Sequence, residues 1–146
     1  MSLQNWQSNG WLRPYRTSPA QIAELFAIAD RDLEDARTER LSNDWQFGIA
    51  YNAALKLCTI LLYAEGFRPE KNLAHYRTLQ ALPLILGPGR QDDADYLDAC
   101  RSKRNTAEYD SVGCVSTDEA RELVAFATGL RQDVKSWLRD NHPELS

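Results

Sequence analysis

Cysteine and histidine are scarce in this sequence, and their scarcity argues against a metal centre or a disulfide framework. The chain has three cysteines, Cys58, Cys100 and Cys114, without any Cys-x-x-Cys pair, and two histidines, His75 and His142. Structural zinc sites need closely spaced sets of such ligands, and disulfide scaffolds need a dense, even set of cysteines. We therefore expect two core thiols and one loop thiol in a reducing compartment, and no cofactor.

The sequence also lacks an apolar run suited to crossing a membrane. Its most apolar stretch, residues 49–64, is interrupted by Asn52 and Lys56 and is shorter than the roughly 20 residues that a membrane span requires. The first residues lack the basic start and apolar run of a secretory signal. We therefore expect a cytoplasmic protein with no membrane partner, in which residues 49–64 belong to a core helix.

Positive charge is not in excess, because 17 basic residues face 21 acidic ones and the net charge is −4. The molecule as a whole repels a phosphate backbone, so any contact with nucleic acid must come from a local basic patch. Glycine and proline number only seven and six among 146 residues. This composition excludes a disordered or fibrous chain and predicts one globular domain with one core.

Apolar residues recur every three or four positions along most of the chain, and this spacing predicts amphipathic helices. Capping residues mark three helix starts, with Ser18 opening 18–40, Asn43 opening 43–66 and Ser116 opening the last helix. A shorter helix over 75–86, kinked or ended by Pro83, and a helix beginning at Asp92 lie between them. No two-residue alternation indicates a sheet. The prediction is an all-α, up-and-down four- to five-helix bundle.

The predicted bundle spans residues 18–140, preceded by an arm of residues 1–17 and followed by a tail of residues 141–146. The arm carries Trp6, Trp11 and Tyr15 among polar residues and turn formers. We expect these aromatic residues to anchor the arm on the bundle or on a second subunit, with stacking on a nucleobase as the alternative.

The best candidate for a chemical site is the segment 101–110, at the end of the helix that begins at Asp92 and just beyond it. At 100° per residue, five of its polar side chains share an arc of about 140° on one helix face. They are Arg101, Arg104, Asn105, Glu108 and Tyr109. Side chains on one arc can meet one ligand together.

The same segment resembles the signature of the HEPN family, small helical bundles that carry an arginine, a polar residue and, a few positions later, a histidine. Here Arg104 and Asn105 are followed after three residues by Tyr109. Residues 44–66 are similar to the family's long apolar helix, the run 75–79 (His-Tyr-Arg-Thr-Leu) to its following segment, and residues 96–110 to its motif helix.

The resemblance implies a homodimer whose motif residues line one cleft, and a metal-independent ribonuclease of a toxin-antitoxin or defence system. Family members are often paired with a nucleotidyltransferase, which would serve as the antitoxin. In this setting Arg104 would clamp a phosphate of RNA or of a nucleotide, and Asn105 would orient it. Arg101 and Lys103 would add positive field.

Tyr109 departs from the family pattern, because a histidine is expected at its position. A phenol of pKa about 10 is only about 0.1% ionised at pH 7, whereas a histidine near 6.5 can both take and give a proton there. Glu108 could replace it if burial raised its pKa, and His75 could do so if the fold or a second subunit brought it close.

A purely structural interpretation of these residues stays open. Arg104 and Glu108, four positions apart, can form an exposed ion pair, Asn105 can end a helix, and Tyr109 can be a core aromatic. His75 can be a capping or surface residue. The alternative functions are then a non-catalytic interaction or sensor module with the same bundle fold, or a binder of a small molecule in the bundle interior.

If Tyr109 occupies the position of a lost acid–base residue, the substitution Tyr109→His should raise any residual ribonuclease activity. The reason is that an imidazole titrates near neutral pH and a phenol does not. The measurement is the cleavage rate of RNA by the purified variant and the unaltered protein at equal folded concentration. An unchanged rate would argue against this role for Tyr109.

Overall fold

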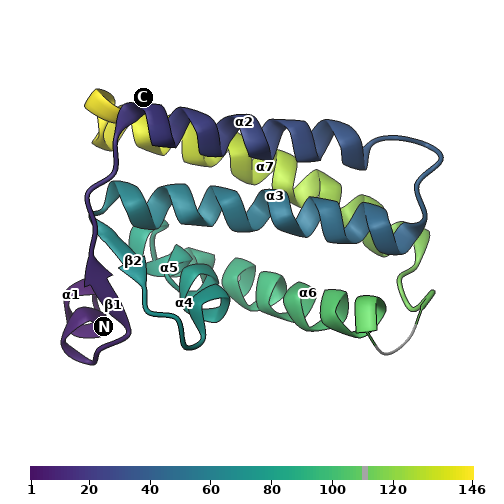
Figure 1. Cartoon of the computed structure of the whole chain (residues 1–146), viewed down its shortest axis with the longest axis horizontal. Helices are drawn as coiled ribbons and strands as arrows, with labels where there is room; N and C mark the ends of the chain where they lie inside the picture. The colour runs from purple at the N-terminus through teal and green to yellow at the C-terminus, as the bar shows by residue number, and fades with distance from the viewer. Residues whose placement is uncertain (110–111) are drawn as a thin grey trace.

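Long antiparallel helices form the body of the protein (Figure 1). The computed structural model describes residues 1–109 and 112–146, and at Glu108 and Tyr109 it describes the backbone alone. Within these residues the long helices are α2 (Pro19–Ala36), α3 (Asn43–Ala64), α6 (Gln91–Tyr109) and α7 (Thr117–Asn141). They run alternately up and down (Figure 1), and this mostly helical architecture is consistent with the expected all-α class.

Shorter elements fill one end of the bundle (Figure 1). They are α1 (Leu3–Ser8), β1 (Leu12–Pro14), β2 (Phe67–Pro69), α4 (Ala74–Gln80), α5 (Leu82–Leu86) and the 3-10 turns Pro88–Arg90 and Pro143–Leu145. The expected helix over 75–86 is thus two helices, α4 and α5, which divide at Ala81, two residues before Pro83.

Helix α3 is the centre of the core. Its side chains are buried on nearly every face, because α2, α4, α6 and α7 all pack against it. It is long and apolar enough to cross a membrane, but 72% of its most apolar window is buried inside the protein. This burial is compatible with the core helix of a soluble protein, as expected for residues 49–64.

The helix starts follow the capping signals closely. Ser18 accepts a hydrogen bond from the Gln21 amide (3.1 Å), and Ser116 and Glu119 form a complete capping box. At α3 the cap is Ser42 and not Asn43, since the Ser42 hydroxyl accepts from the backbone of Trp45 (3.2 Å). The side chain of Gln46 does not complete a capping box there.

Helix α2 is shorter than predicted and ends at Ala36, not near Arg40. Ala36 is the last buried residue of its apolar stripe, and residues 37–40 are all exposed, so nothing holds a further helical turn against the core. The Gln46 side chain instead donates to the carbonyl of Ala36 (2.8 Å) and ties the start of α3 to the end of α2.

Two strands were not expected from the sequence. In the structure β1 pairs with β2 in an antiparallel ribbon, with Arg13 opposite Arg68. Each strand has three residues and ends in a proline. A segment this short shows no alternation, and its pairing depends on a partner more than fifty residues away, which a local pattern cannot reveal.

The N-terminal arm packs on its own bundle. Leu3, Trp6 and Leu12 are buried, and the Trp6 and Trp11 rings meet edge to face at 5.9 Å. The guanidinium of Arg77, on α4, lies 3.7 Å from the centroid of Trp11. The arm therefore anchors α4, the helix that carries His75.

Because Trp6 is only 6% exposed, Trp6→Ala should lower the free energy of unfolding by about 3–5 kcal/mol. Trp45, which is 65% exposed, provides a matched control, and Trp45→Ala should change stability by about 0.5 kcal/mol or less. Urea unfolding followed by far-UV circular dichroism measures both variants. Equal small effects would show that the arm is not part of the folded unit.

Candidate functional site

The candidate site lies where α3, α4 and α6 pack together. Helix α6 begins with Asp92 and Asp93, which suit the positive end of its dipole, and it buries Ala94, Leu97, Cys100 and Ala107 against the core. This buried stripe fixes the rotation of α6. It places Arg101 and Arg104 half-buried at the edge of the stripe rather than in open solvent.

Arg104 lies against a buried aromatic ring. Its guanidinium carbon is 5.5 Å from the ring centroid of Tyr51, a fully buried residue of α3. Burial raises the pKa of the Tyr51 phenol, and the positive charges of Arg101 and Arg104 oppose this rise. The phenol is therefore neutral, and its ring forms an apolar support for the arginine.

Sequence reasoning did not find Tyr51. The only signal was a hydroxyl-bearing aromatic in a helix of otherwise apolar core residues, which does not indicate a site by itself. Its hydroxyl is buried without a hydrogen-bond partner in the described part of the chain.

The fold brings His75 to the two arginines of α6. His75 lies in the first turn of α4, which packs against both α3 and α6. Desolvation of the ring lowers its pKa below the usual 6.5, and the positive charges of Arg104, Lys56 and Arg101 lower it further. The imidazole is therefore neutral at pH 7 and able to accept a proton. The sequence had left this proximity open, and it gave no signal for Lys56.

Asn105 follows Arg104 on α6 and is exposed. Arg101 donates from Nε to a carboxylate oxygen of Asp98 at 2.9 Å, one turn earlier on the same helix. This ion pair is half-exposed, so it offsets part of the charge of Arg101 without hiding the guanidinium.

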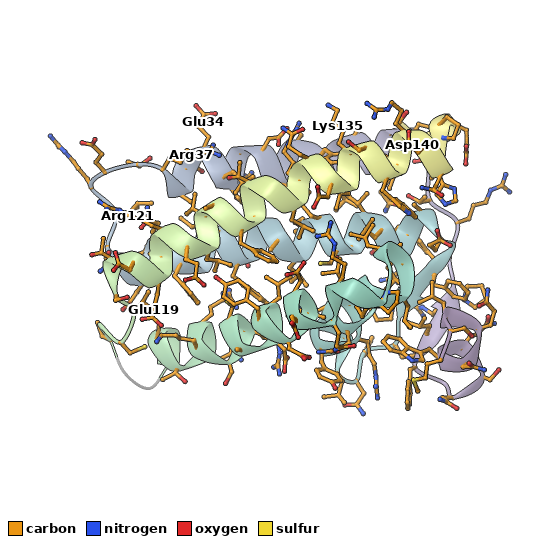
Figure 2. All side chains as sticks on the ribbon, turned by 180° about the vertical axis from the view of Figure 1, so that it is seen from behind. Glu34, Arg37, Glu119, Arg121, Lys135 and Asp140 are labelled. Atoms are coloured by element: carbon orange, nitrogen blue, oxygen red, sulfur yellow. The ribbon has the colours of Figure 1, made fainter. Side chains whose placement is uncertain are left out.

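Lys103, which was expected to add positive field to this site, is paired with a carboxylate of α7. Its ammonium group lies 2.5 Å from a carboxylate oxygen of Glu119, near the start of α7 (Figure 2). That contact lowers the pKa of Glu119 to about 2 and raises the pKa of Lys103. The physical reason is the helical turn of 100° per residue, which directs Lys103 toward α7 and Arg104 toward α3.

Glu108 and Tyr109 were predicted to complete the site. The backbone of both residues belongs to α6, but their side chains lie outside the described residues. Their roles therefore stay predictions.

The thiols lie as expected, with Cys58 and Cys100 buried and Cys114 partly exposed in a loop. In the part of the chain that the structure describes, no three of the His, Cys, Asp and Glu side chains are grouped so that they could hold a metal ion.

Comparison of the chain with protein-family models, with curated proteins and with solved structures found no match in any of the three. The residues and their geometry are therefore the basis for assigning a function.

The electrostatic effect of Arg104 on His75 can be tested by titration. Replacing Arg104 with Gln removes a positive charge, so the pKa of His75 should rise toward 6.5. NMR titration of the imidazole signals measures the pKa, and a His142→Gln background leaves His75 as the only histidine. The control Arg121→Gln changes an exposed residue of α7 and should leave the pKa of His75 unchanged. An equal pKa of His75 in both variants would show that Arg104 lies too far from His75 to affect it.

The stability of the protein should also depend on pH through His75. Because the unfolded chain binds the histidine proton more readily than the folded chain, stability is complete above pH 6.5 and falls as the pH drops below it. His75→Gln should reduce this loss. A pH dependence that is identical with and without His75 would contradict the assignment.

Proposed function

We propose that this protein is a HEPN-like helical domain that binds RNA, with a backbone phosphate held at Arg104. The observation that supports the proposal most strongly is that Arg104 and Arg101 lie within electrostatic reach of His75 where α3, α4 and α6 pack together, with Arg104 set against the Tyr51 ring. An arginine presents a planar set of donors that matches two phosphate oxygens at once.

The support from Tyr51 favours binding because it reduces the freedom of the arginine before the ligand arrives. A guanidinium that is half-buried against a ring loses less conformational entropy on binding than one on a free surface chain. Asn105, the next residue and exposed, is the group that orients the ligand in this proposal.

His75 supplies the acid–base group in place of the histidine that the HEPN-like motif lacks. As a neutral imidazole it takes the proton of the ribose 2′-hydroxyl. The 2′-oxygen then attacks the adjacent phosphorus, and the bond to the 5′-oxygen breaks. The products are a 2′,3′-cyclic phosphate and a 5′-oxyanion, which takes up a proton from water to become the 5′-hydroxyl. Arg104 stabilises the negative charge that develops on the phosphoryl oxygens, and these steps use no metal ion.

The biological setting that we propose is a toxin-antitoxin or defence system, with the protein acting as a homodimer alongside a nucleotidyltransferase-type antitoxin. A second function is favoured by Tyr109, which replaces the histidine of the motif. It is a non-catalytic interaction or sensor module with the same bundle, in which Arg104 binds a ligand without cleavage.

The experiment compares unaltered protein with Arg104→Gln, His75→Gln and the control Arg121→Gln, using a single-stranded RNA oligonucleotide. Loss of the Arg104 contact should weaken binding about tenfold, as expected for charge-assisted hydrogen bonds worth about 1.4 kcal/mol. His75→Gln should abolish cleavage and leave binding within about threefold. Fluorescence anisotropy measures binding, gel analysis measures cleavage, and circular dichroism verifies folding.

The outcomes separate the two functions. Binding that depends on Arg104 without any cleavage supports the non-catalytic module. If Arg104→Gln binds RNA as tightly as Arg121→Gln, or if the unaltered protein does not bind RNA, the proposed function is wrong.

A further inference from the structure

A groove of about 270 Å³ lies between the β1–β2 ribbon, α3 and α4. Four basic side chains from three separate segments of the sequence line it together with His75. These basic residues are Arg13, Lys56, Arg68 and Lys71.

Charge sets this groove apart from the rest of the protein. No carboxylate is among its lining residues, and within residues 1–107 and 112–146 none of its four cations forms an ion pair. Several cations elsewhere are paired with carboxylates, as Arg90 is with Asp133 and Lys103 is with Glu119. A protein with a net charge of −4 therefore gathers unpaired cations in one concave place.

The ribbon register makes this gathering energetically unfavourable without a ligand. Arg13 and Arg68 are directly opposite each other in the antiparallel pair. Like charges at opposed positions destabilise a strand pair, and an anion between them would reverse the sign of that interaction.

Arg68 also has a donor that the described residues do not satisfy. Its Nε is buried and has no hydrogen-bond partner among them, although a buried donor usually has one. Its guanidinium carbon lies 5.1 Å from the centroid of the Tyr15 ring. The side-chain amide of Gln21 donates to the Tyr15 hydroxyl at 2.7 Å and fixes that ring. Arg68 is therefore held in place with hydrogen-bonding capacity unused.

The groove adjoins the candidate site at His75. His75 lines the groove, and its ring lies within electrostatic reach of Arg104 and Arg101. Lys56 belongs to the groove and also acts on His75. His75 therefore links the groove to the two arginines, and a ligand with two neighbouring phosphates is the simplest one that could use both places.

We propose that this groove binds a backbone phosphate of the same RNA strand whose neighbouring phosphate lies at Arg104, so the substrate class is single-stranded RNA with at least two phosphates. The proposal rests on the proposed function. A groove of this volume admits one strand, whereas duplex RNA is recognised across its wide minor groove.

The experiment uses a groove variant and a charge-matched control. The groove variant combines Arg13→Gln with Lys71→Gln, both at exposed positions. The control combines Arg121→Gln with Lys135→Gln, both exposed on α7 (Figure 2). Binding of an adenylate dodecamer and of the dinucleoside monophosphate ApA is measured against salt concentration, with circular dichroism to verify folding.

For the dodecamer, the groove variant should reduce the slope of log K against log salt by about 1.4, or about 0.7 for each lost contact. This corresponds to about 25-fold weaker binding at 0.1 M salt. Binding of ApA, which has one phosphate, should not change. The control should keep the slope of the unaltered protein for both ligands, and Arg104→Gln should weaken both.

Other outcomes separate the two proposals. If the groove variant behaves like the control while Arg104→Gln weakens both ligands, the groove proposal is wrong and the proposed function stands. If only the groove variant weakens the dodecamer and Arg104→Gln has no effect, the proposed function is wrong. Equal affinity for a duplex of the same length, or equal competition by a glutamate dodecamer, would overturn the assignment to single-stranded RNA.

Discussion

The burial of α3 on nearly every side is the constraint on which the rest of the structure depends. Helices α2, α4, α6 and α7 each bury their apolar stripe against it, so its side chains set the distance and rotation of every neighbour. Tyr51 and Lys56 belong to this helix, and they support or charge the surface on which Arg104 and His75 meet. The same helix therefore organises the core and supports the candidate site.

The charges of the protein are paired differently in different parts of its surface. Most of the surface is a mixture of acids and bases, and ion pairs such as Lys103–Glu119 join neighbouring helices. The groove beside α4 is different, since four cations line it and no carboxylate does. A local field of this kind can attract an anion to a protein whose net charge would otherwise repel it.

The fold was largely predictable because helix patterns are local. The caps at Ser18 and Ser116 and the apolar stripes could be identified within one or two turns of chain. The ribbon and the position of His75 could not, because they depend on contacts between distant segments. For the site, the ion pair of Lys103 could not be foreseen either, because its partner, Glu119, lies sixteen residues further on. The roles of Arg101, Arg104 and Lys103 stay predictions.

The most direct test of the central claim is the pKa of His75 with and without bound RNA. In the free protein, desolvation of the imidazole and then the positive charges of Arg104, Lys56 and Arg101 hold its pKa below 6.5. A phosphate bound beside it would offset those charges, so the account predicts that saturating single-stranded RNA raises this pKa. RNA that binds and leaves the pKa of His75 unchanged would contradict the account, because the ligand would then lie elsewhere on the protein.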